Sequence, residues 1–149
     1  MPSTKYIDMC CQAEKLQEKW KVDLGSKVWC QGKGDIFTVG QVGFCCGGYL
    51  HEGFKSDHKC IFQLAQLYDL AFEVCQLGWV TMDEECLGFF YHIMKVMSKK
   101  SISGKVTPNM TKEEAMLTVI MLRGFNEIWN PGEKRWMSAN SKPIIQVVS

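Results

Sequence analysis

The chain has 149 residues, 46% of them hydrophobic, and its 17 basic and 16 acidic residues leave a net charge of +1. That length and apolar content suit a single domain over residues 1–149, with enough apolar surface to bury one core. The small net charge excludes a strong electrostatic pull on a polyanion, and Arg123 and Arg135 are the only arginines with which to contact guanine edges or phosphates. We therefore expect no sequence-specific reading of DNA.

The first residues, MPSTKYIDMC, lack the basic and then apolar pattern of a secretory signal. Charged or amide residues interrupt every apolar run before it reaches the roughly 18 residues of a membrane span. We therefore expect a cytoplasmic protein with no membrane contact. The eight cysteines are then expected to be reduced and to serve as small buried apolar residues, not as a disulfide framework.

Residues 6–20 (YIDMCCQAEKLQEKW) predict the first element of secondary structure. Their apolar side chains recur at steps of three and four residues, which is the spacing of an amphipathic helix. Ser3 or Thr4 can cap this helix, because a side-chain oxygen there accepts a hydrogen bond from a first-turn amide.

Short β-prone runs follow this helix. Residues 28–30 and 36–42 are such runs, and the stretch QGKGD between them predicts a hairpin turn. Further strands are predicted at residues 44–50 and 59–62. Together these runs indicate a small antiparallel sheet.

Helical periodicity returns in the second half of the chain. Residues 62–78 carry a broad apolar face that includes Phe72. Residues 81–100 begin with Thr81 in capping-box spacing to a glutamate, and they carry an apolar face that includes Leu87. We expect two helices whose apolar faces are buried.

A third helix is predicted at residues 111–129, which also begin with a capping box and are apolar almost all round. The stretch NPGEKRW then predicts a turn, and residues 137–149 are expected to form a tail or an edge strand. This order of elements indicates an α+β fold, with an N-terminal helix, a small antiparallel sheet and then three helices packed on it.

Residues 43–60 (GFCCGGYLHEGFKSDHKC) hold three cysteines and two histidines, which suit metal binding by type. A structural zinc site usually takes its ligands from two close pairs, whereas Cys45 and Cys46 are adjacent and would point to opposite faces of a strand. We prefer buried cysteines and surface histidines, with no metal and no cofactor. A zinc-binding regulatory module stays an alternative, with ligands from His51, His58, Cys60 and one of the adjacent cysteines.

A cysteine nucleophile would need a pKa lowered by a nearby histidine or a helix N-terminus. The sequence singles out no such pair, and we expect the cysteines of the predicted helices to be buried: Cys10, Cys11, Cys75 and Cys86. The stretch GKGDIFTVG lacks the lysine and hydroxyl ending of a phosphate-binding loop. We therefore expect no enzymatic activity, and catalysis by a cysteine stays an alternative.

The stretch WNPGEKRW gathers two tryptophans and two cations around one turn. Tryptophan and arginine are the residues that most often carry the binding energy of protein interfaces. We therefore predict a partner-binding site at this turn, formed by Trp129, Lys134, Arg135 and Trp136.

Three blocks of the chain carry a resemblance to a known family: KYIDMCCQAEKLQEKWKVDLGSKVW, KCIFQLAQLYDL and EEAMLTVIMLRGFNEIWNPGEKRW. In this order they resemble a family of small uncharacterised proteins of phages and prophages of Firmicutes. The central block departs from that family, because residues 62–70 lack the proline and the arginine that the family tends to carry there. The resemblance implies a phage origin, and with it the cytoplasm of an infected bacterial host as the location, and it assigns no catalytic residue.

These observations predict a non-enzymatic phage or prophage accessory protein that binds a host factor, in counter-defence or regulation. An alternative is a protein that binds or sequesters a small nucleotide-like ligand, with an aromatic ring for the base and lysines for phosphate. The zinc-binding module is a further alternative.

Overall fold

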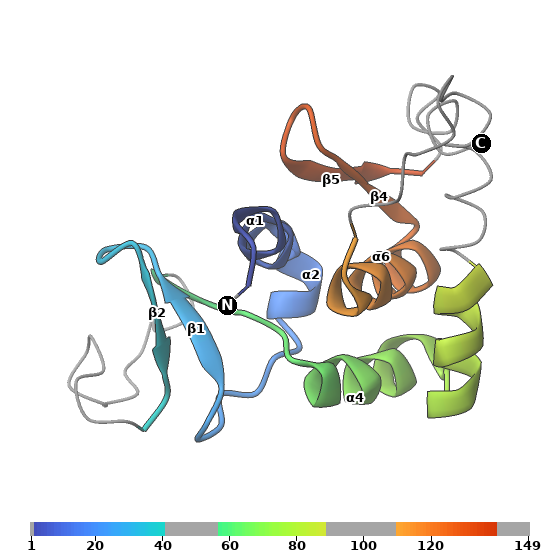
Figure 1. Ribbon diagram of the computed structural model, residues 1–149, viewed down its shortest axis with the longest axis horizontal. Helices are drawn as coiled ribbons and strands as arrows, with labels where there is room; N and C mark the ends of the chain where they lie inside the picture. The colour runs from blue at the N-terminus through green and yellow to red at the C-terminus, as the bar shows by residue number, and fades with distance from the viewer. Residues whose placement is uncertain (1, 41–56, 89–109, 140–149) are drawn as a thin grey trace, which may run out of the picture. The chain divides into compact units, whose positions relative to one another are not determined.

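The computed structural model describes residues 2–40, 57–88 and 110–139, which combine helices with antiparallel strands (Figure 1). This confirms the predicted α+β class, with a helix at the N-terminal end. The chain forms two compact units, residues 1–63 and 64–149. The single domain over residues 1–149 stays a prediction. The strand predicted at residues 44–50 lies outside the described residues.

The N-terminal unit begins with α1 (Thr4–Gln12), and the Ser3 hydroxyl accepts a hydrogen bond from the Tyr6 amide at 3.1 Å, which confirms Ser3 as the cap. The single helix predicted over residues 6–20 is wrong. The chain leaves helical geometry at the buried residue Ala13 and resumes as α2 (Glu14–Gln17). The periodicity continues across this break because both short helices bury one face, so the pattern alone does not reveal it.

The strands β1 (Lys27–Cys30), β2 (Asp35–Thr38) and β3 (His58–Cys60) form an antiparallel sheet in the order β2-β1-β3. The predicted hairpin turn joins the first two, since Cys30 pairs with Asp35. Alternation along β3 buries His58 and Cys60. The prediction of His58 as a surface residue is therefore wrong, because it occupies an inward position of a strand.

In the second unit, α4 (Leu64–Cys75) is followed by a helix whose described part covers residues 79–88. The Met82 amide donates to the Gly78 carbonyl at 2.8 Å, so this helix begins two residues before Thr81. Thr81 is therefore inside the helix, and the capping box predicted at this position is wrong. The later part of the predicted helix, beyond residue 88, lies outside the described residues.

The helix α6 (Lys112–Phe125) is capped as predicted, since the Thr111 hydroxyl accepts a hydrogen bond from the Glu114 amide at 3.2 Å. It packs against α4, and its close approach depends on Gly124, where an added Cβ would lie 2.3 Å from a Val74 methyl carbon. Eight consecutive residues of α6, Glu114 to Met121, are buried. This confirms its expected place close to the core of its unit.

The predicted helix over residues 111–129 is too long, because α6 ends at Phe125 and Asn126 adopts a left-handed conformation. The chain continues as β4 (Glu127–Asn130), which pairs antiparallel with β5 (Arg135–Ser138). Pro131 follows β4 directly and disfavours helical geometry in Asn130. The partner strand β5 then follows after a short turn. The first residues of the predicted tail thus belong to β5, and residues 140–149 lie outside the described part.

Candidate functional site

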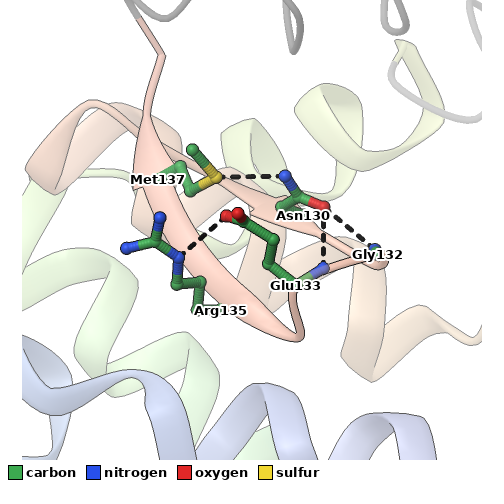
Figure 2. A network of polar contacts seen from close by, with 5 residues as sticks. All are labelled: Asn130, Gly132, Glu133, Arg135 and Met137. Atoms are coloured by element: carbon green, nitrogen blue, oxygen red, sulfur yellow. Dashed lines mark hydrogen bonds and ion pairs between the residues drawn. The ribbon is translucent and has the colours of Figure 1, made fainter.

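The four residues predicted to bind a partner all lie on the β4–β5 hairpin, which Figure 2 shows from close by. Trp129 of β4 pairs directly with Trp136 of β5, and Arg135 is the first residue of β5. Lys134 ends the turn, with a φ of 53° in the left-handed region. The structure therefore brings together four residues that the sequence places around one turn.

The turn of this hairpin is held by Asn130 (Figure 2). Its side-chain oxygen accepts hydrogen bonds from the amides of Gly132, at 2.9 Å, and Glu133, at 3.1 Å. Its side-chain nitrogen lies 3.0 Å from the Met137 sulfur on the facing strand. The Asn130 side chain thus contacts both the turn residues and the facing strand β5, and it fixes the turn relative to the two strands.

Trp129 and Trp136 lie against each other edge to face, with ring centroids 5.3 Å apart and planes at 62°. The Ala139 amide donates to the Asn126 carbonyl at 2.8 Å, and alternation from that bonded pair makes the two tryptophans a non-hydrogen-bonded pair. Side chains approach most closely at such pairs. Trp136 is only 9% exposed and Trp129 is half-buried, so the pair stabilises the hairpin and does not form an open aromatic face.

The cations of the hairpin are exposed. Lys134 and Arg135 are both open to solvent, and the Arg135 Nε atom donates to the Glu133 carboxylate at 2.9 Å (Figure 2). Alternation along the strands puts Arg135 on the hairpin face opposite to Trp129. The four predicted residues therefore do not share one face, and the part of the hairpin that is open to a partner is its cationic tip.

Within the described residues no disulfide joins the cysteines. The absence of a disulfide framework from the whole chain stays a prediction, because Cys45 and Cys46 lie outside the described residues. Burial is the largest cause of the shift at each perturbed thiol. It raises the pKa of Cys11 and of Cys86 to about 11, and it also raises the pKa values of Cys10 and Cys75. A raised pKa opposes the thiolate that a nucleophile requires, so these four cysteines favour a structural role. Cys10 and Cys86 are buried as expected, whereas Cys11 and Cys75 are only half-buried, which corrects the sequence analysis.

Within residues 2–40, 57–88 and 110–139, no three His, Cys, Asp or Glu side chains gather closely enough to hold a metal ion. Of the alternative zinc ligands, His58 and Cys60 are buried on β3. Cys45, Cys46 and His51 lie outside the described residues. The zinc-binding alternative therefore stays a prediction.

A cleft of about 710 Å³, which the sequence analysis did not predict, lies between the helix at residues 79–88 and α6. The first helix contributes four residues and α6 three, at helical spacing, together with the C-cap residue of α6, so one face of each helix lines the cleft: Thr81, Glu84, Glu85, Gly88, Val119, Leu122, Arg123 and Asn126. One Arg123 nitrogen donates to both Glu85 carboxylate oxygens, at 2.7 and 2.8 Å, and this hydrogen bonding raises the pKa of Arg123. The pair ties the two helices together across the cleft.

A second polar cluster that the sequence analysis missed surrounds Tyr68. Its ring stacks on Trp79 with centroids 4.5 Å apart, and its hydroxyl donates to the Asp83 carboxylate. The Lys112 ammonium lies 3.4 Å from that carboxylate and 5.4 Å from the Tyr68 ring centroid. The Tyr68 hydrogen bond, followed by Lys112, lowers the pKa of Asp83. The only sequence signal for this cluster is the four-residue step from Trp79 to Asp83.

Comparisons of the chain with protein-family models, with curated proteins and with solved structures give no match. In the part of the chain that the structure describes, none of the helices has the length and apolar character needed to cross a membrane. The candidate site therefore depends on its own geometry.

Proposed function

We propose that this chain is a non-enzymatic phage or prophage accessory protein that binds a host protein through the tip of the β4–β5 hairpin. The observation that carries the proposal is the pair of exposed cations, Lys134 and Arg135, at the end of a hairpin whose turn is fixed by side-chain hydrogen bonds. The sequence resemblance supports the phage origin. A counter-defence or regulatory role follows from that origin and is part of the proposal.

The hairpin suits binding because little conformational entropy is lost when its tip contacts a partner. The Asn130 hydrogen bonds hold the turn, and the Trp129–Trp136 contact holds the strands. A surface that is ordered in advance loses less conformational entropy on association. This favours recognition by the tip over recognition by a mobile loop.

The partner surface that fits this tip is acidic. Arg135 is paired with Glu133, but both side chains are about half exposed. An exposed ion pair contributes only about 0–1 kcal/mol, so a carboxylate of the partner can replace Glu133 at little cost. Lys134 would add a second contact of the same sign.

The hairpin favours a protein partner over a nucleotide-like ligand. A small ligand would need an aromatic ring and cations around one pocket. Trp129 and Arg135 project from opposite faces of the hairpin, so one small molecule would not contact both in this way. A protein surface that encloses the tip would contact both faces of the hairpin.

Tagged chain recovered from infected host cells tests the proposal, with partners quantified by mass spectrometry and the enriched partner then purified for titration. We expect Lys134→Ala together with Arg135→Ala to weaken binding at least tenfold, which is about 1.4 kcal/mol. Lys33→Ala, in the turn of the β1–β2 hairpin, is the matched control and should leave binding within twofold.

Unchanged binding by the folded double variant would remove the hairpin tip from the proposal. A thermal-shift screen with cyclic and ADP-ribose-type nucleotides tests the alternative, because a ligand at 100 times its Kd stabilises the folded state by about 2.7 kcal/mol. A shift of that size with one nucleotide would replace the protein partner by a small ligand.

A further inference from the structure

Residues 64–88 are strongly acidic in a chain that is otherwise slightly basic. They contain five Asp or Glu residues and no Lys or Arg, whereas the whole chain carries a net charge of +1. Two of the five are paired with cations of α6, Asp83 with Lys112 and Glu85 with Arg123. The other three, Asp69, Glu73 and Glu84, are exposed, and no described residue forms an ion pair with them.

The same segment exposes large apolar side chains. Phe72 is 66% exposed, Trp79 63%, Val80 72% and Leu87 69%. Phe72 and Leu87 were expected on buried faces, so their exposure corrects the sequence analysis. An exposed cluster of this kind with a polar rim is typical of an interaction surface. We name these four side chains and the three unpaired carboxylates, Asp69, Glu73 and Glu84, the corner surface.

The corner surface is built around the turn that joins α4 to the next helix. Phe72 lies in the last turn of α4, Gln76 takes a left-handed φ of 57°, and the Leu77 amide donates to the Ala71 carbonyl at 3.2 Å. The Gln76 amide donates to the Phe72 carbonyl at 3.0 Å, so the left-handed residue ends the helix in an αL-type cap, after which the chain changes direction. Trp79 and Val80 then open the next helix.

Trp79 is held in place by a ring contact. One face of its indole stacks on the buried Tyr68 ring, at 4.5 Å and 15° between planes. Phe72 lies one helical turn after Tyr68 on α4, so both exposed rings border the same buried residue. Along the next helix, Val80, Glu84 and Leu87 follow at steps of four and three, which alternates apolar and acidic groups on one stripe.

We infer that the corner surface docks a basic amphipathic helix of a partner protein. The apolar side chains would take the apolar face of that helix, and Asp69, Glu73 and Glu84 would attract the lysines or arginines beside it. The segment has no cation of its own to compete for those carboxylates. This surface is separate from the hairpin tip and opposite to it in charge, so the two select different partner surfaces.

A synthetic helix of leucine and lysine, about 18 residues long with leucine at steps of three and four, is the probe for this surface. Its binding to the full chain is followed by fluorescence anisotropy. We expect a micromolar Kd that rises at least tenfold with Phe72→Ser and, separately, with Glu73→Lys together with Glu84→Lys. A second apolar variant, Val80→Ser, should act in the same direction if Phe72→Ser fails to fold.

Matched controls come from the N-terminal unit. Leu24→Ser changes an apolar side chain that is 84% exposed. Glu14→Lys with Glu18→Lys makes the same charge change as the double variant of the corner surface, at two exposed positions: one in α2 and one at its C-cap. Both controls should bind the probe within twofold of the unchanged chain, and a scrambled peptide of the same composition should bind at least tenfold more weakly.

Three outcomes would overturn the inference. The first is equal binding by the scrambled peptide, which would indicate charge attraction alone. The second is an equal loss of affinity in the control variants. The third is a dimer in native mass spectrometry that Phe72→Ser dissociates, because a second copy of the chain would then be the occupant of the corner surface.

Discussion

Gln17 pairs with the backbone of Cys60 as a neighbouring strand would. Its side-chain nitrogen donates to the Cys60 carbonyl at 2.9 Å, and its side-chain oxygen accepts from the Cys60 amide at 2.8 Å. The same nitrogen also donates to the Cys10 carbonyl at 2.9 Å. One buried amide group thus joins α1, α2 and the strand β3 in the N-terminal unit.

Replacing Gln17 by leucine is expected to destabilise the protein by about 2–6 kcal/mol, because the Cys60 amide and carbonyl would each lose a buried hydrogen bond and each such loss costs about 1–3 kcal/mol. The Cys10 carbonyl keeps the Ala13 amide as a donor. Urea unfolding measures the change. Gln12→Leu is the control, since Gln12 is exposed at the end of α1 and its replacement should stay within about 0.5 kcal/mol. Equal effects of the two variants would contradict a structural role for the Gln17 amide.

Two threonines with the same capping-box spacing are predicted to differ. Thr111 caps α6, so Thr111→Ala should cost about 0.5–2 kcal/mol of the free energy of unfolding. Thr81 lies inside its helix, so Thr81→Ala should cost nothing and can stabilise by a few tenths of a kcal/mol, since alanine is the better helix former. Thermal or urea unfolding of both variants checks this, and a larger loss at Thr81 would reverse the assignment of the caps.

Several local signals in the sequence, though not the capping-box spacing at Thr81, predicted local structure correctly. The cap at Ser3, the cap at Thr111 and the turn after Cys30 depend on hydrogen bonds or dihedral angles within a few residues, so short stretches of sequence contain them. The candidate residues of the hairpin were likewise found because they surround one turn.

The other failed predictions concern features that depend on residues distant in the sequence. Periodicity placed Phe72 and Leu87 on apolar faces, but burial depends on which face a neighbouring element covers, and none of the described elements covers these two. The residues after Phe125 include apolar side chains, which occur in both helices and strands, so their pattern does not distinguish the two. Pairing with β5 makes this segment a strand. The burial of Trp136 follows from the same hairpin and from packing that the sequence does not specify.

Stability is predicted to fall as the pH rises above 9. The thiols of Cys11 and Cys86 ionise near their ordinary pKa of 9.0 when unfolded but only at about 11 when folded, chiefly because burial disfavours the thiolate. Between these values the unfolded state binds fewer protons, so the stabilising contribution is complete below pH 9 and is lost as the pH rises through 11. Urea midpoints at pH 8 and pH 10 measure the fall.

The combined variant Cys11→Ala and Cys86→Ala is the comparison for this pH effect. Its midpoint should fall less between pH 8 and pH 10 than that of the unchanged chain, whatever the variant costs at pH 8. The same fall in both proteins would show that other groups, such as lysines, account for the pH dependence.

The two hairpins offer a paired test of backbone strain. Four residues join the strands in each, residues 31–34 and 131–134, and the fourth residue is left-handed in both, with a φ of 64° at Gly34 and 53° at Lys134. Glycine adopts this conformation freely, whereas a residue with a Cβ is disfavoured there by about 1–2 kcal/mol. An added Cβ at Gly34 would meet no atom within 4 Å, so backbone strain is the only cost expected of Gly34→Ala.

We predict a loss of about 1 kcal/mol for Gly34→Ala and a gain of similar size for Lys134→Gly, measured by urea unfolding. Gly32→Ala serves as the control, because Gly32 has open space around it and no positive φ, so its replacement should change stability by less than about 0.5 kcal/mol. Changes of the same sign at Gly34 and Lys134 would contradict the left-handed assignment of one of the two turns.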